Sequence, residues 1–319
     1  MIYHFLINPA AGKGNLIDTL EKKVRRVCDA RGADYRVHRT TRQGDATAYV
    51  RAALEETDER QRFFACGGDG TLCEAINGAP AGDARAEFGV IPIGTGNDFA
   101  RNFTAPESFF DIEKQLNGTA IALDALAYND RYALNMINIG FDCNVVEKTG
   151  QIKRSPLIPT GLAYIAGVGI TLCKPFGTPM HITLEDGTEV KEALLLSAIA
   201  NGAYCGGGFR AAPRASLTDG LLDLCLIRKV SRVKFLRLVS SYRAGTHLEN
   251  PLCRDVIRYH QTPSVHFAFE EPVSICVDGE IEMTDHVEIR AVQAAFTFSL
   301  PAGSVLREGA ADAAEPATV

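Results

Sequence analysis

The chain has 319 residues, of which 46% are hydrophobic and 23% charged, and its formal net charge is −6 at pH 7. This composition is that of a globular protein long enough for two domains of ordinary size. The negative charge and the lack of a Lys/Arg block argue against nucleic acid as the main partner, whereas membrane contact through a local patch stays open.

The nine cysteines are scattered, with no C-x-x-C pair and no His at zinc spacing, which favours a reducing compartment over a disulfide framework. The first five residues lack a basic segment and run into a strand-like stretch, so we expect no signal peptide. The longest apolar stretch, residues 157–173, contains one proline and three glycines. We therefore expect a buried or surface-lying helix there, no transmembrane segment, and a cytoplasmic protein.

A buried strand is expected over residues 3–7, ending at the sequence N-P-A-A-G-K-G (8–14). Apolar residues then recur at helical spacing over residues 16–30, which predicts a helix. The loop between them is not a Walker A loop, because that loop requires G-x-x-x-x-G-K-[ST] and here Gly14 follows Lys13. By itself it is either a site for nucleotide phosphates or a plain turn between strand and helix.

The apolar residues 63–66 predict a second buried strand, which ends at G-G-D-G-T (67–71) before a helix over residues 72–77. Glycines let the backbone turn sharply and approach an anion closely, and a helix N-terminus favours phosphate. Asp69 would repel a phosphate unless it binds Mg²⁺, receives a proton or orders a group that does. The alternative is a tight turn in which Asp69 caps the helix.

Residues 34–39 alternate like a strand, a helix follows to about residue 56, and residues 87–93 form another apolar strand before G-T-G-N-D (94–98). Strands alternating with helices predict an α/β domain with a parallel sheet and helices on its faces. Ligands bind at the carboxyl ends of such strands, and three of the four ends combine Gly with Asp, Asn, Thr or Lys. We therefore expect a nucleotide-binding domain over residues 1–125.

From residue 121 the pattern changes to successive strands, expected at 121–128, 132–139, 181–184, 194–200, 221–227, 264–269, 273–277, 287–291 and 295–300. Helices are expected around residues 160–172 and 230–243. This predicts a β-rich, sandwich-like domain over residues 126–302. The tail, residues 303–319, is rich in Ala, Glu and Pro, so we expect it to be disordered or to pack back on the first domain.

The sequences N-P-x-x-G (8–12), G-G-D-G-T (67–71) and G-T-G-N-D-F-A-R (94–101) resemble the N-terminal motifs of the diacylglycerol kinase catalytic domain family. That family includes soluble bacterial lipid kinases and the sphingosine and ceramide kinases. The likeness continues through D-G-L-L-D-L (219–224) and V-D-G-E (277–280). The second motif alone is shared with NAD kinases and phosphofructokinase-like loops, whereas the third motif and the late D-G-E are more specific. The resemblance implies a first domain of the NAD-kinase and phosphofructokinase type, with the active site in the cleft between the two domains.

The resemblance further implies that ATP binds along the three loops and beside the end of the second strand. The residues implied to contact it are Asn8, Pro9, Ala10, Ala11, Gly12, Thr40, Gly67, Gly68, Asp69, Gly70, Thr71, Leu72, Cys73, Thr95, Gly96, Asn97 and Asp98. Thr41 is also a candidate for the contact of Thr40, but spacing from Gly44 favours Thr40. Glu280 matches the position of the proton acceptor, and Asp278 beside it could share that work.

Acidic residues matching positions implied to form a network with Mg²⁺ are Asp69, Asp98 and Asp124. A separate Mg²⁺ site in the second domain is implied at Ser216, Asp219 and Leu221, two of them through backbone carbonyls. Phosphoryl transfer does need charge neutralisation, and an alcohol acceptor needs a carboxylate to take its proton. Without the resemblance, V-D-G-E (277–280) and D-G (219–220) would be interpreted first as hairpin turns, and Asp124 as a buried carboxylate that requires partners.

We therefore expect an ATP-dependent lipid kinase that phosphorylates a lipid hydroxyl, with diacylglycerol as the default acceptor and phosphatidic acid as the product, and that meets the membrane peripherally. The alternatives are an NAD kinase, against which the N-P start and the late D-G-E argue, and a nucleotide-binding regulator without transferase activity. Residues 157–172, with Lys153 and Arg154, could supply an apolar face and a basic flank for an anionic membrane, or an interior helix. The sequence leaves open the acceptor, the nucleotide and the oligomeric state, a homodimer included.

Overall fold

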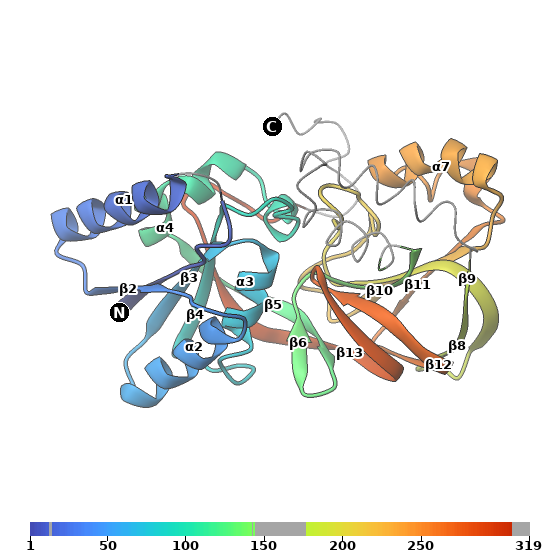
Figure 1. The fold of residues 1–319 in the computed structure, drawn as a ribbon, viewed down its shortest axis with the longest axis horizontal. Coiled ribbons are helices and arrows are strands. Elements are labelled where there is room, and N and C mark those ends of the chain that lie inside the picture. Colours follow the sequence, from blue (N-terminus) through green and yellow to red (C-terminus); the bar gives the residue numbers. More distant parts are fainter. Residues whose placement is uncertain (13–14, 142, 144–176, 308–319) are drawn as a thin grey trace. The chain divides into compact units, whose positions relative to one another are not determined.

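A computed structural model describes residues 1–12, 15–141, 143 and 177–307, and the chain divides into two compact units (Figure 1). Unit 1 comprises Met1–Ala125, Leu217–Asp219 and Val292–Val319, and unit 2 comprises Leu126–Ser216 and Gly220–Ala291. Unit 1 mixes helices with strands and unit 2 is rich in strands. The expected architecture of an α/β domain and a β-rich domain is thereby confirmed. The expected helix around residues 160–172 lies outside the described residues.

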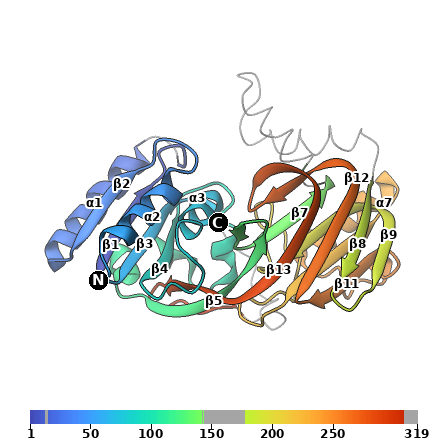
Figure 2. The ribbon, with the colours of Figure 1, turned by 90° about the horizontal axis from the view of Figure 1, so that it is seen from below.

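Unit 1 is built on a sheet whose first four strands pair in parallel in the order β2-β1-β3-β4. Its elements in chain order are β1 (Ile2–Ile7), α1 (Leu16–Arg31), β2 (Tyr35–Arg39), α2 (Asp45–Glu56), β3 (Gln61–Gly67), α3 (Asp69–Ile76), β4 (Ala86–Pro92), η1 (Phe99–Asn102), η2 (Pro106–Phe110) and α4 (Ile112–Leu116). Helices α1 and α4 cover one face of the sheet and α2 and α3 the other (Figures 1 and 2).

Helix α1 shows how the apolar pattern produces this packing. Its buried residues Ile17, Leu20 and Val24 recur at three- and four-residue intervals, so they form one stripe, and this stripe packs against Phe64 of β3 and neighbouring core residues. Each such side chain contributes about 1.5–3 kcal/mol on burial. The helix ends at Gly32, whose left-handed conformation (φ 61°) lets its N–H donate to carbonyls of the last turn.

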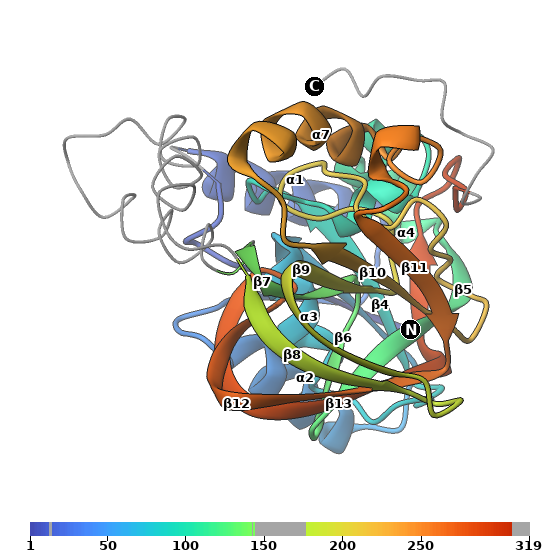
Figure 3. The same ribbon diagram turned by 90° about the vertical axis from the view of Figure 1, so that its right-hand side faces the viewer.

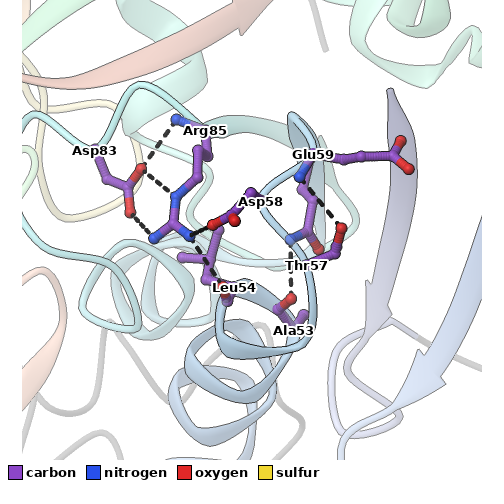
Figure 4. Close-up of polar contacts among 8 residues, drawn as sticks. Ala53, Leu54, Thr57, Asp58, Glu59, Asp83 and Arg85 are labelled. Carbon is purple, nitrogen blue, oxygen red and sulfur yellow. Dashed lines mark hydrogen bonds and ion pairs between the residues drawn. The ribbon is translucent and has the colours of Figure 1, made fainter.

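Arg85, which lies just before β4, joins the start of that strand to the end of α2 (Figure 4). Its guanidinium donates to both carboxylate oxygens of Asp83, to the Leu54 carbonyl at 3.1 Å and to Asp58. Gln61 donates to the Ala53 carbonyl beside it. These contacts join the strand starts to the end of α2 and leave the opposite edge of the sheet to carry the loops.

Unit 2 is formed by antiparallel strands, in the order β11-β10-β9-β7-β12-β13, with β8 paired to both β9 and β12. Its elements are β6 (Arg131–Ala133), β7 (Met136–Gly140), β8 (Thr178–Leu184), β9 (Glu189–Ala200), β10 (Leu222–Arg228), α7 (Arg232–Ala244), η3 (Pro251–Cys253), β11 (Ile257–Thr262) and β12 (Ser264–Val277). Helix α7 lies over β9, β10 and β11 (Figures 1 and 3). The described residues contain no helix long and apolar enough to cross a membrane.

Two strands run through both units: β5 (Thr119–Tyr128) and β13 (Glu280–Leu300). In unit 2, β13 pairs antiparallel with β12, and its last part pairs in parallel with β4, as Phe298 opposite Phe88. Residues up to 302 were expected in the second domain, whereas the chain re-enters unit 1 at Val292. The described part of the tail follows β13 onto unit 1, where Thr104 donates its backbone N–H to the Val305 carbonyl at 2.9 Å.

Candidate active site

The carboxyl ends of β1 to β4 meet at one edge of the unit 1 sheet. Ile7, the last residue of β1, is in register with Arg39 of β2 and Cys66 of β3, and Gly67 of β3 is in register with Pro92 of β4. The loops that follow these strands are therefore neighbours. The residues expected to contact the nucleotide lie in these loops, at the end of β3 and in the first part of α3.

Asn8 ties the first loop to the second. Its side-chain amide donates to the Thr71 hydroxyl at 3.0 Å, and its side-chain oxygen accepts the Ala10 N–H at 2.9 Å. Its own N–H donates to the Cys66 carbonyl at 3.0 Å. Asn8 thus shapes the loop, while Pro9 and Ala10 beyond it are exposed. The sequence analysis did not foresee this bond between the first two loops, because it joins residues far apart in the chain.

Two glycines at this edge are required by packing, and one is not. A Cβ on Gly67 would lie 2.2 Å from the Thr71 hydroxyl, and a Cβ on Gly94 would lie 2.5 Å from the Gly68 Cα. Neither position accepts a side chain. A Cβ on Gly68 would meet nothing closer than 3.5 Å, and the φ of Gly68 is −97°. Space is therefore left open in front of Gly68, where a ligand could approach the backbone.

Asp69 is the first residue of α3, but it does not cap that helix; Gly68 occupies the N-cap position. Instead its carboxylate accepts backbone N–H groups from the third loop: Oδ2 from Asp98 at 2.9 Å and Oδ1 from Phe99 at 3.0 Å. The helix-cap alternative for Asp69 is therefore not what the structure adopts. The residue joins the second loop to the third.

The other members of the second loop differ in exposure. Thr71, Leu72 and Cys73 are buried, with Leu72 at 0% exposure and Cys73 at 6%. Their side chains belong to the core of unit 1. The side chains of Leu72 and Cys73 therefore support the loop from inside, and the contact of these two residues with the nucleotide stays a prediction.

The third loop is held by Asn97, whose side-chain amide donates to the carbonyls of Pro92 and Gly94, both at 2.9 Å. Asp98 is buried and pairs with Arg101 at 3.3 Å. A Cβ on Gly96 would lie 3.4 Å from Asp69 Oδ2 and 3.5 Å from Asp98 Oδ2. The two carboxylates therefore border the same small space. Carboxylate oxygens are the ligands that Mg²⁺ prefers, so this pair fits the ion.

The two threonines after β2 have different partners, and the assignment of Thr40 to the nucleotide stays a prediction. Both the N–H and the hydroxyl of Thr41 donate to Asp45 Oδ2, at 2.7 and 3.0 Å. The Thr41 N–H holds the pKa of the Asp45 carboxyl below its ordinary value. Thr40 uses its N–H to reach the Ile7 carbonyl at 2.9 Å, which places it beside the first loop.

Asp124 is almost fully buried and lies where segments of unit 1 from distant parts of the sequence meet. Its Oδ1 accepts the Ala294 N–H at 2.8 Å, and its N–H donates to the Leu217 carbonyl at 2.8 Å. The buried Asp124 carboxylate thus has a backbone N–H group among its partners. Asp124 joins the segments around Leu217 and Ala294, and its role in binding Mg²⁺ stays a prediction.

The expected second Mg²⁺ site, Ser216, Asp219 and Leu221, lies on the stretch just before β10. Asp219 is exposed, and Gly220 beside it has φ 73°, so the chain turns there. In the described part of the chain, no three His, Cys, Asp or Glu side chains gather closely enough to hold a metal ion. A site built from one carboxylate, a hydroxyl and carbonyls is a different donor set, so this assignment stays a prediction.

In unit 2, Asp278 and Gly279 form the two-residue turn between β12 and β13, both with positive φ (45° and 96°), as a tight hairpin requires. The Asp278 carboxylate accepts the N–H groups of Leu134, Asn135 and Met136, at 2.7, 3.0 and 2.9 Å. These bonds interrupt the single strand expected over residues 132–139 and separate β6 from β7.

Glu280 differs from Asp278 in its surroundings. It opens β13, is exposed, and forms no side-chain hydrogen bond with another residue in the described ranges. Three backbone donors hold the Asp278 carboxylate in place, and its share in the work of the base stays a prediction. Of the two residues, Glu280 is the more exposed and Asp278 is half-buried.

Unit 2 also contains an apolar cavity of 240 Å³ beneath α7. Its walls include Phe235, Leu238, Val239 and Tyr242 of α7, Leu195 and Leu196 of β9, and Ile227 of β10. The sequence analysis did not find this cavity. The spacing of 235, 238, 239 and 242 is that of one helix face, but such a stripe is equally typical of a helix packed on a filled core.

Comparison with known proteins agrees with the two-part organisation. Residues 3–128 match the family model described as the diacylglycerol kinase catalytic domain, and residues 135–298 match the YegS C-terminal NAD kinase beta sandwich-like domain. The chain is 31% identical over 287 residues to a Bacillus subtilis (strain 168) protein named diacylglycerol kinase, covering 86% of this chain and 88% of that one.

Two further similarities cover nearly the whole chain. A protein of Chromohalobacter salexigens named "Probable lipid kinase YegS-like" is 29% identical over 303 residues, covering 92% of this chain and 93% of that one. A crystal structure described as a diacylglycerol kinase from Bacillus anthracis strain Sterne superposes with a TM-score of 0.69 at 23% identity, covering 95% of this chain and 98% of the other. The last similarity bears on the fold alone.

Proposed function

The chain belongs to the family of diacylglycerol kinases and related lipid kinases, and from this premise we propose that it transfers the γ-phosphoryl group of ATP to the hydroxyl of diacylglycerol, giving phosphatidic acid. We assign nucleotide binding to unit 1, of the NAD-kinase and phosphofructokinase type, and acceptor binding to unit 2, with the division near residue 125. The protein acts peripherally, at the cytoplasmic surface of a membrane.

The observation that carries the choice of acceptor is the apolar cavity of unit 2. Its walls beneath α7 are almost entirely hydrocarbon and aromatic, from Phe235 and Leu238 to Ile227. A volume of 240 Å³ bounded in this way suits part of an acyl chain and offers few polar partners to a water-soluble dinucleotide. This supports a lipid acceptor over NAD.

The residues of unit 1 would bind and orient the nucleotide. Phosphates would approach the backbone in front of Gly68, with Asn8 and Thr40 at the neighbouring strand ends. Asp69 and Asp98 would hold Mg²⁺, which neutralises charge on the transferred phosphoryl group. Asp124 completes the proposed acidic set, and Ser216, Asp219 and Leu221 the second site.

Unit 2 would supply the proton acceptor. Glu280 takes the proton of the lipid hydroxyl as the new O–P bond forms and the bond from the γ-phosphorus to the bridging oxygen of ADP breaks. Asp278 holds the turn that carries Glu280, through its three bonds to the backbone of residues 134–136. The base must be an accessible carboxylate, and Glu280 meets this requirement.

The test is transfer of label from γ-labelled ATP, with Mg²⁺, to diacylglycerol in mixed detergent micelles by the full chain, with chromatographic identification of the product. We expect labelled phosphatidic acid. Formation of NADP⁺ from NAD⁺ in place of a labelled lipid would identify an NAD kinase instead. Tight ATP binding with no transfer to diacylglycerol or to total membrane lipid would identify a nucleotide-binding regulator.

A further inference from the structure

Helix α7 exposes apolar side chains on the face that points away from the cavity. Val233 is 61% exposed and Leu236 is 59% exposed, and their spacing of three places them together on the solvent side. The buried residues of α7, Leu238 and Ser241, lie on the opposite side. A solvent face with large aliphatic groups at its centre is costly for a protein that functions only in water.

The same face is strongly basic. Its exposed charged residues are Arg232, Arg237 and Arg243, and α7 contains no acidic residue. Within the described ranges Arg237 forms no ion pair. The chain as a whole carries a net charge of −6, so this helix is a local reversal of charge. An anionic surface would attract this face while repelling the average surface of the protein.

The turn η3 extends this surface. Leu252 in η3 is 63% exposed, and the next residue, Cys253, lines the cavity. Cys253 belongs to the same buried cluster as Leu238 of α7, so η3 packs beside this helix. Leu252 is therefore a further exposed aliphatic side chain on an element that packs beside α7.

We propose that the outer face of α7, together with Leu252, is the surface by which the protein docks on an anionic phospholipid bilayer. Aliphatic side chains flanked by Arg and Lys match the boundary between acyl chains and anionic headgroups. The phosphates of a nucleic acid would contact the basic side chains but would leave Val233 and Leu236 exposed to water. The proposal rests on the proposed function, because a lipid acceptor has to be taken from a membrane, and the inner face of this helix walls the apolar cavity.

The test is sedimentation of the full chain with vesicles of phosphatidylcholine alone or mixed with phosphatidylglycerol. Arg237→Glu is compared with Arg51→Glu, because both are exposed helix arginines without an ion pair in the described structure, and both change the net charge equally. The double change Val233→Ser with Leu236→Ser is compared with Val305→Ser, another exposed aliphatic residue at 60%. Phosphorylation of diacylglycerol in detergent micelles is measured for every variant.

We expect the wild type to bind anionic vesicles, Arg237→Glu and the serine pair to bind about tenfold more weakly, and both controls to bind like the wild type. Activity in micelles stays unchanged in all variants, since none of these residues lines the cavity or the loops. Wild-type binding by both α7 variants, or binding of RNA but not vesicles, would overturn the proposal. Vesicle binding through α7 by a protein that phosphorylates no lipid would leave the surface in place and refute the proposed function alone.

Discussion

The Asp69 carboxylate accepts the backbone N–H of Asp98 at 2.9 Å, so the acidic residue of the second loop fixes the main chain of the third. Its other oxygen accepts the Phe99 N–H at 3.0 Å. The two loops therefore form one rigid unit with two carboxylates beside Gly96. Asp69 holds the third loop whether or not it also binds Mg²⁺. Its replacement tests the structural role and the proposed metal-binding role together.

Asp69→Asn removes the charge and leaves one oxygen to accept two backbone N–H groups. We expect kcat to fall by about 10²–10⁴-fold and the free energy of unfolding to fall by about 1–3 kcal/mol, because a backbone donor loses its acceptor. Steady-state kinetics and denaturant unfolding measure the two effects. Asp98→Asn is the matched control, since Asp98 supplies its N–H and not its carboxylate to this contact. Full turnover by Asp69→Asn would leave Asp69 with the structural task alone.

Gly68→Ala and Gly67→Ala separate ligand approach from packing. A methyl group fits at Gly68, so that variant should fold normally but lose ATP affinity by blocking the backbone in front of it. At Gly67 the methyl group would collide with the Thr71 side chain, so that variant should lose stability by about 1–3 kcal/mol. ATP titration and thermal unfolding measure this. Unchanged ATP affinity in folded Gly68→Ala would show that phosphates bind elsewhere.

Glu280→Gln and Asp278→Asn should fail in different ways. The Glu280 change keeps size and hydrogen bonding but cannot accept a proton, so kcat should fall by about 10²–10⁴-fold with unchanged stability. The Asp278 change disturbs an acceptor of three backbone N–H groups, so stability should fall by about 1–3 kcal/mol. If Asp278→Asn abolishes turnover while remaining as stable as the wild type, the two assignments are reversed.

Filling the cavity should discriminate between acceptors by chain length. Val239→Phe adds volume to the wall beneath α7, so KM should rise for long-chain diacylglycerol and stay close to wild type for a short-chain form. Ala52→Phe, at an exposed position of α2, is the control and should leave KM unchanged for both substrates. If Val239→Phe changed KM equally for both substrates, the cavity would not be the site that binds the acyl chain.

Acidification should destabilise both units through buried histidines. Burial lowers the pKa of His4 in unit 1 and of His247 in unit 2 to about 4 each. Because the unfolded chain binds these protons from about pH 6.5 and the folded chain only near pH 4, the free energy of unfolding should fall across that window, by on the order of 3 kcal/mol per histidine at pH 4.

Denaturant unfolding at several pH values measures this loss. His247→Gln should remove part of the pH dependence, whereas His286→Gln should keep it, because the His286 side chain is 71% exposed. An identical pH dependence in His247→Gln and the wild type would show that burial of His247 does not oppose its protonation.

The sequence predicted the strand–loop–helix units of the first domain because their signals are local. Gly67 and Asp69 stand next to the strand and helix that they separate, and the family resemblance added Glu280. What Asp69 contacts could not be predicted, since Asp98 is 29 residues away and meets it only in the folded sheet. The same holds for Asn8, whose partner Thr71 lies 63 residues along the chain.

The second domain was predicted less completely, because its strands depend on non-local pairing. Strand β11 was missed, since I-R-Y-H-Q-T (257–262) carries polar side chains that only its pairing with β10 accommodates. Strand β12 was predicted as two pieces because Pro272 and two glutamates interrupt it, and the structure absorbs them in a shift of register between Ala268 and Val273. The cavity was missed because it depends on what α7 covers.

The return of β13 to unit 1 has a consequence for biosynthesis. During translation the first four strands of unit 1 leave the ribosome long before Phe298, which pairs beside β4 and stacks on Phe103. Until then the edge of β4 and the aromatic rings after the third loop have no cover. The nascent chain can therefore complete the sheet of unit 1 only after unit 2 has emerged, so a ribosome stalled before Val292 would leave an unpaired strand edge that is prone to aggregation.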